Sequence, residues 1–121
     1  MTKILAMALL ALFPLQALGA FSLKTEIETK EGDEESETLG VEAGKSGSIT
    51  AGNLTVKLTP VRLDAKTVGL KVEIHKAVAG GKSELLATPS IVATLGEPAN
   101  ISEITDDGTT LYKIRVVPRE K

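Results

Sequence analysis

The chain has 121 residues with a formal net charge of −2, and aromatic residues make up only 2% of it. This composition excludes a strongly basic nucleic-acid-binding face, and it excludes the aromatic platforms on which sugars and single-stranded nucleic acids stack. Cysteine is absent, which excludes disulfides, thiolate metal ligands and a thiol nucleophile. An aliphatic core or a partner must therefore hold the fold together.

Residues 1–20 have the three parts of a secretory signal peptide: a lysine near the start, an apolar run, and small residues up to Ala20. A signal anchor is the rival interpretation. It is disfavoured because the apolar run contains Pro14 and is shorter than the roughly 20 residues that span a bilayer. We therefore expect cleavage before Ala20 or Phe21, no stable membrane span after processing, and a periplasmic or secreted location in a bacterium.

Residues 21–29 alternate apolar and polar side chains, which is typical of a strand with one buried face. The next segment, about residues 30–48, is rich in Glu, Gly and Ser. We expect a mobile loop there, because the segment cannot bury enough apolar surface to order itself. Its acidic residues are a candidate docking loop for a basic partner. They are Glu31, Asp33, Glu34, Glu35 and Glu37.

Alternation resumes in residues 54–63, where the apolar positions change parity at Pro60. Proline lacks the N–H that a ladder requires, so we expect this strand to lie at an edge or to bend there. Residues 68–75 form the clearest strand, and the single histidine, His75, falls on its polar face. No phosphate-loop, metal-ligand or nucleophile motif has the required spacing, so we expect neither enzymatic activity nor a cofactor.

Residues 85–95 form a strand broken by Pro89, and a turn leads into a further strand over residues 99–105. Asp107 and Gly108 then supply a hairpin turn, because this pair adopts positive φ at little cost. The last strand follows over residues 109–117.

The mature chain, residues 21–121, is long enough for one domain only. Its connections of a few residues require neighbouring strands to run antiparallel, since a parallel crossover needs a dozen residues or more. We therefore predict an all-β fold, an antiparallel meander that forms a small sandwich or an open barrel after a cleaved signal peptide.

Residues 87–101 read ATPSIVATLGEPANI. A Thr-Pro pair, alternating aliphatic residues and threonines, a turn and an Ala-x-Ile sequence make this stretch resemble the β-core of bacterial secretins, the ring-forming outer-membrane proteins of type II and III secretion and type IV pili. The resemblance implies a secretin-like β unit used alone, with Pro89 and Gly96 setting its geometry. It does not imply a channel, because the chain is too short for a secretin's periplasmic modules and long core.

These features favour an exported, non-enzymatic β-domain that acts through protein–protein contact at an exposed strand edge, where unpaired backbone groups accept a partner strand. The residues expected at this edge are Pro89, Ser90, Thr94 and Gly96. The expected partner is another envelope or periplasmic protein, or a second copy of the chain. The alternative is a periplasmic binding protein or hydrolase inhibitor that docks through the acidic residues at 31–37.

Overall fold

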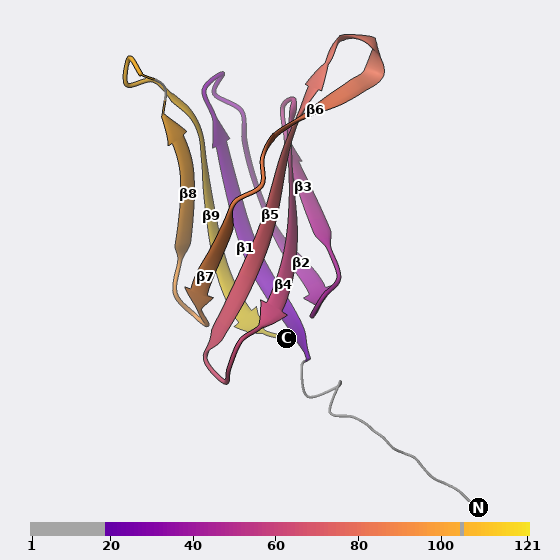
Figure 1. Ribbon diagram of the computed structural model, residues 1–121, viewed down its shortest axis with the longest axis vertical. Coiled ribbons are helices and arrows are strands. Elements are labelled where there is room, and N and C mark those ends of the chain that lie inside the picture. Colours follow the sequence, from indigo (N-terminus) through magenta and orange to yellow (C-terminus); the bar gives the residue numbers. More distant parts are fainter. Residues whose placement is uncertain (1–18, 105) are drawn as a thin grey trace, which may run out of the picture.

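The computed structural model describes residues 19–104 and 106–121, and it consists of two antiparallel sheets packed face to face as a sandwich (Figure 1). The predicted all-β fold is confirmed. The signal peptide predicted for residues 1–20 falls, up to residue 18, outside the described residues. Within the described part of the chain, no helix has the length and apolar character to cross a membrane.

The first sheet has the order β2-β1-β9-β8. Its strands are β1 (Ala20–Thr29), β2 (Glu34–Glu42), β8 (Ala99–Ile104) and β9 (Thr110–Glu120). The second sheet has the order β3-β4-β5-β6, and β7 pairs with β5 beyond the end of β6. Its strands are β3 (Gly47–Ala51), β4 (Leu54–Arg62), β5 (Thr67–Val78), β6 (Lys82–Ala87) and β7 (Ser90–Thr94), with a short 3₁₀ turn, η1 (Ala79–Gly81), between β5 and β6. The predicted break at Pro89 is confirmed, since it separates β6 from β7.

The core lies between the two sheets and follows the period of two in the sequence. Every second residue of β1 and β5 points inward, and their aliphatic side chains are almost fully buried. Burying each such side chain contributes roughly 1.5–3 kcal/mol. The most deeply buried large apolar side chains are Phe21, Leu23, Ile27, Val56, Leu58, Val68, Leu70, Val72, Ile74, Ile114 and Val116.

An arginine joins the two sheets at one end of the sandwich. Arg62, on β4, forms an ion pair with Glu120 on β9, and its guanidinium lies 5.0 Å from the centre of the Phe21 ring on β1. Its side chain is only 14% exposed. The cation therefore closes this end of the core by pairing with a carboxylate and an aromatic face.

The prediction of a mobile loop over residues 30–48 is wrong, because residues 34–42 form the strand β2. This strand pairs with β1 along its whole length. Leu39 and Val41 are buried, and Gly47 of β3 packs against both side chains, which ties the second half of β2 to the core. The acidic first half of the strand stays exposed, so its charges carry no burial cost.

The strand that contains Pro60 was predicted to lie at an edge or to bend there, but β4 lies between β3 and β5 and keeps the same face buried through Pro60. Pro60 continues the buried row of β4, and Val61 lies on the outer face. The proline is tolerated because β3 ends opposite Leu58, so the ladder on that side of β4 has already stopped. The carbonyl of Pro60 instead accepts a hydrogen bond from the Gly44 N–H (2.8 Å).

Candidate functional site: an open strand edge

β7 lies on the open side of the second sheet and pairs only with β5. Two hydrogen bonds at its ends fix the direction of its backbone groups. The Val72 N–H donates to the Pro89 carbonyl (2.9 Å), and the Leu95 N–H donates to the Lys66 carbonyl (2.8 Å). Because backbone groups alternate in direction along a strand, the odd-numbered residues from 89 to 95 turn their backbone groups toward β5.

The even-numbered residues of β7 therefore turn their backbone N–H and C=O groups away from the sheet. These residues are Ser90, Val92 and Thr94, all of which are exposed. The Thr94 carbonyl accepts one hydrogen bond from Glu97 (3.0 Å), which leaves its second lone pair open. Among the described residues, nothing accepts a hydrogen bond from the three outward N–H groups. Thus β7 presents a short, open row of donors and acceptors.

Pro89 and Gly96 bound this row, and each has a geometric role. Pro89 has no N–H to leave unpaired, while its carbonyl anchors the start of β7 to β5. Gly96 has φ +84°, which favours glycine, and its N–H donates to the Pro118 carbonyl of β9 (2.7 Å). The turn after β7 therefore crosses to the first sheet, so β7 and β8 lie side by side in different sheets and do not pair as a hairpin (Figure 1).

A row of exposed aliphatic side chains on the outer face leads to the same edge. Val61, Gly69 and Val92 are in register across β4, β5 and β7. Gly69 has no side chain, and Leu63 packs over it at 3.6 Å from the position of a Cβ. Val61, Leu63 and Val92 are 37%, 54% and 67% exposed, and we call them the outer apolar row. The change of parity at Pro60 was visible in the sequence, but it did not show that Val61 and Leu63 lie on the outer face.

The core is also incompletely covered on the side of the sandwich where β7 and β8 lie. The partly buried hydrophobic residues that pack against the core are Ala43, Ala87, Ile91, Leu95, Ala99, Ile101 and Leu111. All but Ala43 lie on or near β7 and β8. On the opposite flank, β2 and β3 close the core tightly, since a Cβ on Gly47 would come within 2.8 Å of Val41. The β7–β8 flank is therefore the open side of the sandwich.

The remaining edge strands carry features that discourage pairing, and β7 does not. Charged side chains on an edge strand oppose the addition of another strand. Four glutamates lie on β2, β6 carries Lys82 and Glu84, and β8 carries Glu103. β3 is uncharged, but its exposed side chains are the polar Ser48 and Thr50. Only β7 combines an uncharged sequence with an adjoining apolar row among the edge strands described.

The structure divides the acidic residues predicted as a docking loop. Asp33 belongs to the turn, where its N–H donates to the Thr29 hydroxyl oxygen (3.1 Å) and its carboxylate accepts from that hydroxyl (3.4 Å). Glu34 lies opposite Glu28, on the other face of β2 from Glu35. The remaining two, Glu31 and Glu37, are exposed in the turn and on β2. The described residues contain no cluster of three or more side chains suited to hold a metal ion.

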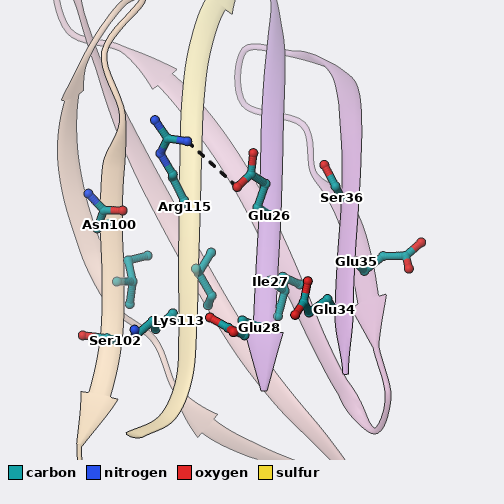
Figure 2. A pocket seen from close by; sticks show the side chains of 12 residues that line it. Glu26, Ile27, Glu28, Glu34, Glu35, Ser36, Asn100, Ser102, Lys113 and Arg115 are labelled. Atoms are coloured by element: carbon teal, nitrogen blue, oxygen red, sulfur yellow. Dashed lines mark ion pairs between the residues drawn. The ribbon is translucent and has the colours of Figure 1, made fainter. Parts of the chain in front are cut away.

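A shallow depression of about 870 Å³ crosses the outer face of the first sheet (Figure 2). In register, Glu26 lies opposite Arg115 and Glu28 lies opposite Lys113. The Arg115 guanidinium is 3.9 Å from the Glu26 carboxylate. Glu34 and Glu35 of β2 also line the depression, so its lining holds four carboxylates and only two cations and is acidic on balance. Sequence analysis missed it because its residues come from four strands.

Two other ionisable side chains have structural partners. The Tyr112 hydroxyl donates to the Glu103 carboxylate (2.9 Å), and burial together with that carboxylate raises the pKa of Tyr112 to about 12. His75 lies 3.2 Å from the carboxylate of Glu73 on the same strand face.

Comparison of the chain with models of protein families, with curated proteins and with solved structures finds no match. The fold and the site together define the class: an antiparallel β-sandwich in which the edge strand β7 is open and uncharged and adjoins the outer apolar row. The resemblance of residues 87–101 to secretins stays a prediction from sequence.

Proposed function

We propose that this protein is an exported, non-enzymatic β-sandwich that binds another protein chain by pairing one of its strands with β7. The observation that carries the proposal is the set of outward N–H groups of Ser90, Val92 and Thr94, which have no acceptor among the described residues. The signal-peptide pattern in residues 1–20 supports export.

The addition of a strand would use both parts of the site, namely the outward backbone groups of β7 and the outer apolar row. Main-chain hydrogen bonds to the outward groups contribute roughly 0.5–1.5 kcal/mol each. Because they involve backbone groups alone, they do not select the sequence of the incoming strand. Selectivity then comes from side chains, and Val92 offers an apolar contact on the outer face. An aliphatic residue of the incoming strand opposite Val92 would extend the outer apolar row.

A photoreactive amino acid placed at single positions in the native host tests the proposal. We expect position 92 to form a discrete adduct with a protein, because its side chain lies beside the incoming strand. Position 48 is the matched control. Ser48 is exposed, and the register of β3 turns its backbone outward as well. Equal adducts from both positions, or none from position 92, would contradict the proposal.

Proline substitutions separate backbone pairing from side-chain contact. Thr94→Pro removes one outward N–H of β7, and we expect it to abolish the adduct at position 92 while circular dichroism shows an intact fold. Ser48→Pro removes the equivalent group of β3 and should leave the adduct unchanged. If adducts form instead from a photoreactive residue at position 35, the acidic docking alternative replaces the β7 proposal.

A further inference from the structure

We infer that the chain paired with β7 is a second copy of this protein, related to the first by a two-fold axis at Val92. The inference rests on the proposed function and deepens it by naming the occupant of the edge.

The positions of the outward backbone groups carry the inference. Ser90 and Thr94 lie two residues on either side of Val92, so the open row is symmetric about this residue. In an antiparallel pair of β7 strands, Val92 lies opposite Val92 of the second copy, and Ser90 lies opposite Thr94. Every outward N–H then meets an outward C=O, as the two-fold symmetry of a closed dimer requires.

The side chains also suit self-pairing. On the outer face, each cross-strand Ser–Thr pair can form a hydrogen bond, and the two Val92 side chains, each 67% exposed, meet at the axis. On the inner face, the large Ile91 lies opposite the small Ala93 of the second copy. Because β7 carries no charge, no like charges meet anywhere along the pair.

The surroundings of β7 extend the contact beyond five residues. The outer apolar row of one copy becomes continuous with that of the other, because Val92 is the end of the row at the sheet edge. The partly buried side chains of the open flank, including Leu95 and Ile101, come next to the second copy. A single short strand pair is small for a stable interface, so this additional apolar contact is what makes the second copy a fitting occupant.

Cysteine cross-linking of protein expressed from the full sequence tests the inference, because the chain contains no cysteine of its own. Directly opposed residues in a hydrogen-bonded antiparallel pair have Cα atoms about 5.5 Å apart, within the range of a disulfide. We expect Val92→Cys to form a disulfide-linked dimer under mild oxidation, at least about tenfold faster than the exposed control Ser48→Cys.

The register gives a second, independent test. Ser90→Cys alone and Thr94→Cys alone should stay monomeric, since neither residue lies opposite itself. An equimolar mixture of these two variants should cross-link, since Ser90 of one copy lies opposite Thr94 of the other. Melting curves followed by circular dichroism confirm that each variant folds.

The inference is overturned if Val92→Cys cross-links no faster than Ser48→Cys, or if the mixture behaves like either variant alone. A photo-adduct at position 92 with a different protein, without disulfide dimers, would overturn the second copy as occupant and leave the proposed function standing. Failure of both experiments would remove β7 as a binding edge.

Discussion

At the scale of one residue, the single tyrosine of the chain forms a hydrogen bond between two strands of the first sheet. Tyr112 is 4% exposed, and its hydroxyl joins β9 to Glu103 of β8. Burial and the neighbouring carboxylate both disfavour the phenolate, which raises its pKa to about 12. The contact therefore stabilises the fold below the unfolded pKa of about 10, and this stabilisation is lost as the pH rises through about 12.

We predict that phenolate absorbance of the folded protein titrates with a midpoint near 12. Because no other tyrosine is present, the signal belongs to Tyr112 alone. The Glu103→Gln variant removes the negative charge and should lower the midpoint, with burial still holding it above 10. A folded protein that titrates near 10 would show that Tyr112 is hydrated and unpaired.

Two glycines at the open flank give a matched pair of alanine substitutions. Gly96 has φ +84°, and nothing lies within 4 Å of a Cβ there, so the cost of alanine is that of the left-handed backbone alone, about 1–2 kcal/mol. Gly69 lies in the strand, and a Cβ would make ordinary contact with Leu63 at 3.6 Å.

We expect Gly96→Ala to lower the free energy of unfolding by about 1–2 kcal/mol and Gly69→Ala to change it by less than about 0.5 kcal/mol. Urea unfolding measures both values, provided that the dependence of the unfolding free energy on urea concentration is the same for each variant. Equal losses would mean that the turn after β7 does not hold Gly96 in its left-handed conformation.

At the scale of elements, β2 is the strand whose sequence was wrongly predicted to form a loop. Its first five residues, 34–38, are all exposed, and three of them are glutamates, so composition indicated a loop. The strand forms because a tight turn, closed by Thr29 and Asp33, returns the chain along β1, and because Leu39 and Val41 reach the core. Pairing with a neighbour is a tertiary property that local composition does not contain.

We therefore predict that Leu39→Ala destabilises the protein by about 2–3 kcal/mol, the usual cost of a cavity at a buried leucine. Glu37→Ala, two residues away in the exposed first half of β2, should change stability by less than about 0.5 kcal/mol. Thermal unfolding compares the two. A negligible effect of Leu39→Ala would restore the interpretation of residues 30–48 as a mobile loop.

The strands with strict alternation were predictable, and the open edge at β7 was predictable only in part. Residues 21–29 and 68–75 fall in β1 and β5, and the strand predicted for residues 109–117 falls in β9 from Thr110 onward, because one buried face imposes a period of two. Pro89, which lacks a ladder N–H, and the turn at residues 96–98 indicated from sequence that this stretch lies near a sheet edge. Which N–H groups turn outward depends on pairing with β5, and a shift of one residue would reverse it.

At the scale of the whole molecule, the two flanks of the sandwich differ. β2 and β3 close one flank with buried aliphatic contacts, whereas β7 and β8 leave the other with six partly buried hydrophobic residues. The turn at 95–98 is short enough for a hairpin, but it crosses between the sheets, as its hydrogen bond to Pro118 and the pairing of β7 with β5 and of β8 with β9 show. This crossing creates the open flank, which is where we place the second copy.

Hydrogen exchange at individual amides, measured over a range of protein concentrations, tests the central claim most directly. In dilute protein, the N–H groups of Ser90, Val92 and Thr94 should exchange rapidly, while those of Ile91 and Ala93, which face β5, are protected. As the concentration rises, we predict that these three amides become protected together while the outward amide of Ser48 stays fast. Protection of the three amides in dilute monomer, or rapid exchange at every concentration, would contradict the pairing of β7 with a second copy.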